Sequence, residues 1–182
     1  MNPSLPHDPR LPSTAAKTGL TRSVLVAGIG NVFLGDDGFG VEVADALRRR
    51  TLPAGVEVAD YGIRGFDLAA ALLETDVAIL VDAIPRQDKT IGDVFVLEPE
   101  LPDEEVSAEP VNGHALDPME VFRLARRLGG PLPETYLVGC CPGPVDESEE
   151  GEIGLSPPVA AAVGPACDLV ARLVFRSVAE EV

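Results

Sequence analysis

The chain is poor in basic residues. Its 182 residues include 14 Lys and Arg against 30 Asp and Glu, so the formal net charge is −16 at pH 7. A protein this acidic repels phosphate backbones and anionic lipid headgroups, which argues against nucleic acid and membrane surfaces as partners. An excess of acid is also what an ordinary soluble surface carries, so the net charge does not identify the partner.

Long apolar runs and a disulfide framework are also missing. No run approaches the roughly 18 apolar residues of a membrane span, and residues 1–21 lack the apolar core of a signal peptide. We therefore expect a flexible tail over residues 1–21 and a single domain over residues 22–182. Cys140, Cys141 and Cys167 form an odd set without disulfide spacing. Reduced, mostly buried thiols in a cytoplasmic protein are the simplest interpretation.

Several familiar catalytic motifs are absent. The sequence has no G-x-S-x-G elbow, no H-E-x-x-H and no Gly-rich Walker loop, which argues against the serine, zincin and P-loop chemistries. Histidine is scarce as well: of the two in the chain, His7 lies in the expected tail. A site that needs an imidazole therefore has only His114 to use.

What the sequence does contain is a regular alternation of strand-like and helix-like segments. Short apolar runs predict strands over residues 23–28, 56–59, 77–81, 91–97 and 135–140. Amphipathic or capped stretches predict helices over residues 38–50 and 66–73, from an N-cap at Asp117 to Gly129, and over 156–177. The alternation indicates an α/β sandwich with a mostly parallel sheet.

The stretch between residues 28 and 40 organises the chain. It begins with Gly28 and Gly30, which suit a sharp turn after a strand. A dinucleotide fingerprint is the first interpretation, but Phe33 occupies its third glycine position. Asp36 and Asp37 then lie where a helix N-terminus would meet a pyrophosphate, and two carboxylates repel a phosphate and attract a cation. The loop is therefore suited to a metal ion or to proton transfer.

Asp82 and His114 are the natural companions of these acids. Asp82 ends the predicted third strand, and ligands in such sheets gather at the carboxyl ends of strands, where the strand order reverses. If the first and third strands are neighbours, Asp37 and Asp82 converge. Two carboxylates and the imidazole of His114 suit nickel, zinc or manganese. We expect both carboxylates, with ordinary pKa values near ~4, to stay ionised at neutral pH.

Each of these residues has a simpler role open to it. Asp36 or Asp37 could cap the following helix, which leaves one acid of the pair without a capping task. Asp82 could hold a turn, and His114 could be an ordinary loop histidine. For Asp60, at the end of the predicted second strand, bonds to backbone amides in the turn at Gly62 are the favoured interpretation.

At these residues the sequence resembles the hydrogenase maturation endopeptidases. The resemblance rests on Gly28-Ile29-Gly30-Asn31 with Asp36-Asp37-Gly38-Phe39-Gly40, then Val81-Asp82-Ala83, then His114, and it extends over about residues 23–176. It implies a three-layer sandwich in which a five-stranded sheet lies between helices on both faces. It also implies metal-contacting and catalytic roles for Asp37, Asp82 and His114. The supporting positions of the site are Gly28, Gly30, Asn31, Asp36, Gly38, Gly40 and Asp60.

The resemblance further implies a task. A member of this family would trim a short C-terminal extension from the large-subunit precursor of a nickel–iron hydrogenase, with the nickel supplied by the precursor itself. We expect such a protein to act as a monomer. A non-catalytic nickel-sensing chaperone that uses the same three residues is an alternative, and a nucleotide-binding α/β domain with Asp60 near the ribose is another.

Overall fold

A computed structural model describes residues 22–100, 117–144 and 153–179. The predicted tail and His114 lie outside these ranges. The described strands are β1 (Val24–Ile29), β2 (Val56–Gly62), β3 (Val77–Ala83), β4 (Val94–Leu97) and β5 (Glu134–Cys140). The described helices are the short 3₁₀ turn η1 (Gly35–Gly38), α1 (Phe39–Leu47), α2 (Gly65–Leu72), α3 (Pro118–Arg127) and α4 (Pro157–Ala179).

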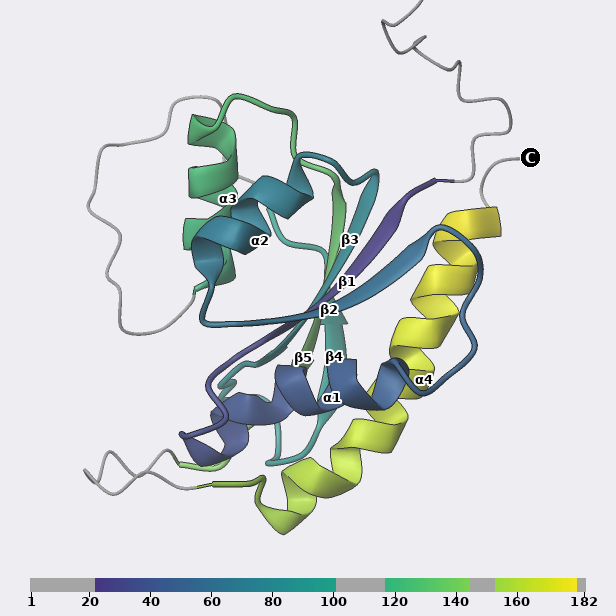
Figure 1. The fold of residues 1–182 in the computed structure, drawn as a ribbon. Helices are drawn as coiled ribbons and strands as arrows, with labels where there is room; N and C mark the ends of the chain where they lie inside the picture. Colours follow the sequence, from purple (N-terminus) through teal and green to yellow (C-terminus); the bar gives the residue numbers. More distant parts are fainter. Residues whose placement is uncertain (1–21, 101–116, 145–152, 180–182) are drawn as a thin grey trace, which may run out of the picture.

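The strands described here form one twisted sheet in the order β2-β1-β3-β5-β4 (Figure 1). β1, β2, β3 and β5 run parallel, and the edge strand β4 is antiparallel to β5. The mostly parallel five-stranded sheet expected from the sequence is therefore confirmed. β1 and β3 are direct neighbours, and the strand order reverses between them, as a doubly wound sheet requires.

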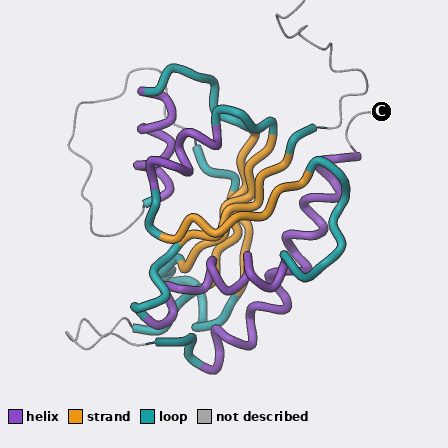
Figure 2. Tube along the Cα trace, viewed as in Figure 1, coloured by secondary structure: helices purple, strands orange, loops and turns teal. Residues whose placement is uncertain are grey.

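Helices cover both faces of the sheet, as the tube view also shows (Figure 2). Alternate residues of β1 and β3 point to opposite faces, so Val24 and Val26 pack with α1 and α4 while Leu25 and Ala27 pack with α2 and α3. Because both faces are covered, β1 is buried along its whole length. This explains why it appears in the sequence as an unbroken apolar run rather than an alternating one.

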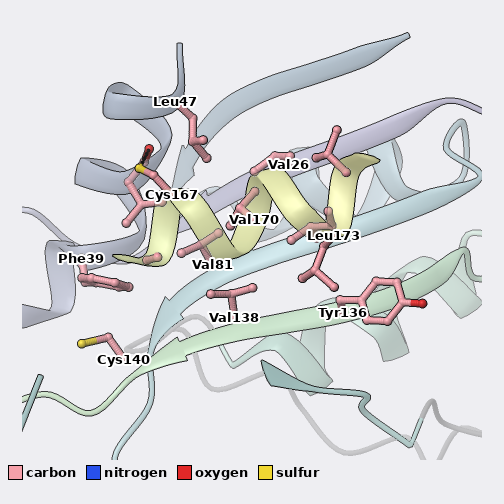
Figure 3. Packing of buried hydrophobic residues seen from close by; sticks show 14 of the residues in the cluster. Val26, Phe39, Leu47, Val81, Tyr136, Val138, Cys140, Cys167, Val170 and Leu173 are labelled. Carbon is pink, nitrogen blue, oxygen red and sulfur yellow. Dashed lines mark hydrogen bonds between the residues drawn. The ribbon is translucent and has the colours of Figure 1, made fainter. Parts of the chain in front are cut away.

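α4 is the long helix of the first face. Cys167, Val170 and Leu173 lie among the core side chains that it packs onto the sheet (Figure 3). Among the described helices, α4 is also long and apolar enough to cross a membrane, judged by length and composition alone. Core helices of soluble proteins pass the same test, and here the apolar side of α4 is buried against β-strands and α1.

The predicted elements differ from those observed by one to three residues at their ends, and three of these differences are informative. The helix expected over residues 38–50 is divided into η1 and α1, and α1 ends at Leu47. β3 continues through Asp82 to Ala83, so Asp82 is a strand residue and not a turn residue. β4 starts at Val94, three residues later than expected, because Gly92 adopts a φ of +88° in the turn that precedes it.

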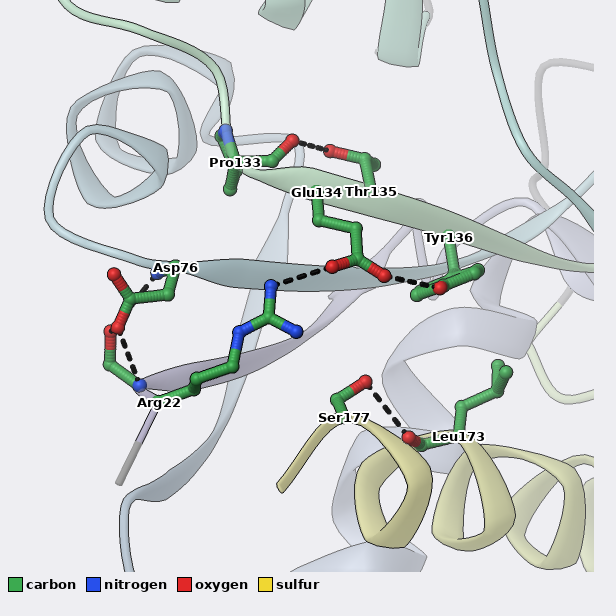
Figure 4. Close-up of polar contacts among 9 residues, drawn as sticks. Arg22, Asp76, Pro133, Glu134, Thr135, Tyr136, Leu173 and Ser177 are labelled. Atoms are coloured by element: carbon green, nitrogen blue, oxygen red, sulfur yellow. Dashed lines mark hydrogen bonds and ion pairs between the residues drawn. The ribbon is translucent and has the colours of Figure 1, made fainter. Parts of the chain in front are cut away.

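Polar contacts hold the sheet together at the N-terminal ends of its parallel strands (Figure 4). Arg22 donates to a carboxylate oxygen of Glu134 over 2.6 Å, and the other oxygen of Glu134 accepts from the hydroxyl of Tyr136. The hydroxyl of Thr135 donates to the carbonyl of Pro133 over 2.8 Å. At these N-terminal ends the polar side chains bind one another. The C-terminal ends of β1 and β3, called here the carboxyl edge of the sheet, carry a pocket instead.

Candidate functional site

A pocket of about 400 Å³ opens at the carboxyl edge of the sheet. It lies where β1 and β3 diverge, on the side covered by α2 and α3, since Asp82 shares its face with Ala78 and Leu80. Its polar lining consists of Asn31, Asp37, Asp82 and Asp117. Its apolar lining consists of Ile29, Leu34, Ile63, Ala83, Ile84, Pro85, Pro118, Met119, Leu137 and Pro142, with Gly30 between them.

Asp37 reaches this pocket from η1. The backbone N–H of Asn31 donates to its Oδ2 over 2.7 Å, and the side-chain oxygen of Asn31 accepts from the N–H of Phe33 over 3.0 Å. The turn is close-packed, because a Cβ added to Gly30 would lie 1.8 Å from the carbonyl oxygen of Asp37. Gly30 also has a φ of +127°, which L side chains rarely adopt. This tight loop therefore fixes Asp37 relative to β1.

Asp82 enters the same pocket from β3. Its side chain is buried, and its Oδ1 accepts from the N–H of Ala83 over 2.8 Å. The pKa of Asp82 is raised to about 8, chiefly by burial and in smaller part by the negative charges of Asp37 and Asp117, against the opposing effect of the hydrogen bond from Ala83. The expectation that Asp82 is ionised at neutral pH is therefore wrong: the buried carboxyl holds its proton there.

Asp36 is not among the residues that line the pocket, and it does not cap a helix. In the described residues, its buried carboxylate accepts from the N–H of Gly143 (2.8 Å), the N–H of Ser156 (2.7 Å) and the hydroxyl of Ser156 (2.9 Å). Neither η1 nor α1 has a side-chain cap. The predicted capping role of Asp36 or Asp37 is wrong, because long-range donors occupy Asp36 instead.

The predicted role of Asp60 is wrong as well. Its Oδ1 is buried and has no hydrogen-bond partner, so it does not hold the amides of the Gly62 turn. Asp60 follows Val56 and Val58 on the α1 side of β2, whereas the pocket lies on the other side of the sheet. It is therefore not part of the pocket lining.

The glycines of the loop allow close packing. A Cβ on Gly28 would lie 2.3 Å from the carbonyl oxygen of Gly40, and one on Gly40 would lie 2.1 Å from that of Val81. A Cβ on Gly38 would lie 3.1 Å from Cα of Val32. Helix and strand therefore do approach closely here, at Gly28 and Gly40 rather than at the position of Phe33.

Sequence reasoning treated Asp117 only as a helix cap. It is one, since its Oδ1 accepts from the N–H of Met119 over 2.9 Å, but it also lines the pocket. A signal for this was available: the crossover helix α3 runs opposite to the parallel strands, so its N-cap lies at their carboxyl edge. The apolar wall built by Ile63, Met119 and Pro142 has no comparable signature in the sequence.

The pocket carries oxygen ligands of the kind a divalent cation takes. Asp37 and Asp82 are both present, as predicted, and Asp117 adds a third carboxylate at the rim. Within residues 22–100, 117–144 and 153–179, no group of three or more His, Cys, Asp or Glu side chains is arranged to hold a metal ion. The predicted third ligand, His114, lies outside those ranges.

Comparison with known proteins agrees with this architecture. The sequence model of the hydrogenase maturation protease family matches residues 41–173. The hydrogenase 2 maturation protease of Escherichia coli is 34% identical over 163 residues, which cover 87% of this chain and 94% of that protein. The hydrogenase expression/formation protein HupD of Bradyrhizobium diazoefficiens is 32% identical over 152 residues, with coverage of 83% and 77%.

Solved structures give the same result. The hydrogenase maturating endopeptidase HybD from Escherichia coli superposes with a TM-score of 0.69 at 31% identity, covering 85% of this chain and 93% of that one. The [NiFe] hydrogenase maturation protease HycI from Thermococcus kodakarensis superposes with a TM-score of 0.57 at 26% identity, covering 87% and 95%. The chain described here belongs to the hydrogenase maturation protease family and is a peptide hydrolase.

Proposed function

We propose that this protein removes a C-terminal extension from the large-subunit precursor of a [NiFe] hydrogenase, and that cleavage waits for nickel carried by the precursor. The observation that carries the proposal is the convergence of Asp37 and Asp82 on one pocket at the carboxyl edge of β1 and β3. A cation placed there would be bound by the oxygens of Asp37 and of Asp82 once Asp82 gives up its proton, and a precursor without nickel would offer no such cation.

The protonation of Asp82 gives this pocket a specific chemistry. Because Asp82 holds a proton up to a pH of about 8, a cation that binds its oxygens must displace that proton. Nickel in the precursor would supply Lewis acidity at the scissile carbonyl or at a water. Asp37, which accepts the N–H of Asn31 on one oxygen, is our candidate for the base that removes a proton from water.

The apolar walls suit a peptide substrate. Ile63, Met119 and Pro142 line the pocket beside the acids, and Ile63 is 66% exposed at its rim. Apolar walls exclude water from a bound backbone and strengthen the electrostatic interactions inside the pocket. We propose that the segment to be cleaved lies along these walls, with its nickel-bearing part toward Asp37 and Asp82.

The direct test is incubation of the purified protein with the large-subunit precursor, followed by mass analysis. We expect loss of a C-terminal fragment from the nickel-loaded precursor and no change in the nickel-free precursor. Cleavage of both forms alike would refute the nickel requirement. Intact nickel-loaded precursor would refute the proposed cleavage and favour a nickel-sensing chaperone.

His114 remains a proposed third ligand. A ligand imidazole must be neutral, and an ordinary histidine pKa is ~6.5. Nickel titration of His114→Ala by calorimetry should give weaker binding at pH 7.5 than the wild type and a flatter dependence between about pH 5.5 and 7.5. Equal affinities and equal slopes would remove His114 from the site.

A further inference from the structure

Asp36 joins three segments that are far apart in the sequence. It lies in η1, one of its bonds reaches Gly143 just after β5, and two reach Ser156 at the start of α4. These partners are 107 and 120 residues away along the chain. Since Gly143 and Ser156 bind the same carboxylate, Asp36 also holds the backbone just after β5 beside the start of α4.

The neighbouring residue in η1 is Asp37, which lines the pocket. A turn of four residues has little rigidity of its own, because its helical hydrogen bonds are few. On one side the turn is confined by Gly30, and on the other it is tied by the carboxylate of Asp36. We propose that Asp36 is a positioning residue for peptide cleavage, which fixes Asp37 in the pocket by anchoring η1 to the start of α4 and the end of β5.

The bonding pattern explains why an acid is needed there. One backbone N–H points at each carboxylate oxygen: that of Ser156 at Oδ1 and that of Gly143 at Oδ2. An ionised carboxylate accepts at both oxygens, whereas an amide accepts at one and donates at the other. In Asp36→Asn, one backbone N–H would therefore face an N–H₂ group whichever way the amide is turned. Both oxygens of Asp36 are therefore used as acceptors by protein donors.

The NMR signal of the Asn31 amide proton can be used to detect a change in the position of Asp37, with no substrate present. This N–H donates to Asp37 Oδ2 over 2.7 Å, a short charge-assisted bond. In Asp36→Asn, we expect the amide proton of Asn31 to move upfield in the NMR spectrum and to exchange faster, because Asp37 is released. Ser177→Ala is the control: it removes one buried hydroxyl bond within α4, from Ser177 to the carbonyl of Leu173, at the end of the helix far from Asp36.

Kinetics provide the second measurement, which rests on the proposed cleavage of the precursor. Misplacement of a reacting group by about 1 Å can cost about 100-fold in rate. We expect a loss of that order in kcat for Asp36→Asn, with KM changed little, because the pocket walls remain intact. Ser177→Ala should retain both wild-type values.

The outcomes separate the two proposals. A folded Asp36→Asn variant with the wild-type Asn31 resonance would overturn the role of Asp36, whether or not the precursor is cleaved. A shifted resonance in a protein whose wild type leaves the precursor intact would refute the proposed function alone. If Asp36→Asn does not fold, Ser156→Ala still removes the hydroxyl bond and keeps the backbone bonds. It should shift Asn31 in the same direction by less, and an unchanged resonance there would overturn the inference.

Discussion

Asp37 meets the pocket with one of its oxygens already bonded to the backbone. In Asp37→Asn, the amide oxygen can still accept from the N–H of Asn31, so the loop should keep its shape while the charge is lost. We expect an unchanged melting temperature and a loss of precursor cleavage of about 100-fold or more, the range of a missing base. Mass analysis of the precursor measures this, and wild-type processing by the variant would exclude Asp37 from the reaction.

The burial of Asp82 makes the free energy of unfolding depend on pH. The folded pKa of Asp82, about 8, lies above that of an exposed aspartate, so the folded state holds a proton that the unfolded state releases above about pH 4. The contribution of Asp82 to stability is therefore complete below about pH 4 and is lost as the pH rises toward about 8. Above that pH the buried carboxyl is ionised at a constant cost.

Asp82→Asn should remove this loss, because an amide keeps the bond from Ala83 and carries no charge. We expect the variant to be more stable than the wild type by at least about 1 kcal/mol at pH 8, with little difference near pH 4. Urea unfolding at both pH values measures the difference, and cleavage should be lost in the same variant. A variant less stable than the wild type at pH 8 would show that Asp82 is ionised there at no cost.

At the scale of elements, α1 packs on the sheet through glycine. A Cβ on Gly40 would lie 2.1 Å from the carbonyl oxygen of Val81 and 2.3 Å from that of Ile29, and backbone atoms of buried strands cannot move aside. Gly40→Ala should therefore destabilise the protein by about 3 kcal/mol or more. In Gly164→Ala, on the exposed side of α4, the new Cβ meets nothing within 4 Å outside its own stretch of helix, and the gain in helix propensity is offset by crowding against the ring of Pro165, so stability should change by less than about 1 kcal/mol. Thermal unfolding compares the pair, and equal melting temperatures would contradict this packing.

Element order and type could be predicted from the sequence because burial leaves a periodic trace. The apolar runs of β1 and β3 and the cap of α3 at Asp117 are local patterns, and each was found where expected. The antiparallel direction of β4 could not be predicted, since four half-buried residues look alike in either direction. The hydrogen bonds of Asp36 could not be predicted, because their donors are far away in the sequence. The raised pKa of Asp82 could not be predicted either, because it depends on how deeply the folded chain buries the carboxyl.

On the scale of the whole molecule, exposed apolar side chains lie both beside the pocket and away from it. Comparing one of each tests where the substrate binds. Ile63 is 66% exposed at the rim of the pocket, and Phe175 is 56% exposed on α4, away from it. Ile63→Asp should raise KM for the precursor about tenfold and leave the melting temperature unchanged, because the rim contacts substrate and not the core. Phe175→Asp should change neither quantity. Equal values of KM in the two variants would place the substrate elsewhere.

The burial of all three thiols has a practical consequence for labelling the protein. Cys140, Cys141 and Cys167 are buried, and burial raises the pKa of Cys140 to about 12 and that of Cys167 above its usual value, so few thiolates are available to react. An alkylating dye should therefore leave the folded protein unmodified and add three labels in denaturant, as counted by mass spectrometry. A cysteine introduced in place of the exposed Phe33 would then be the single reactive position on an otherwise native chain, and fluorescence could follow the precursor as it arrives.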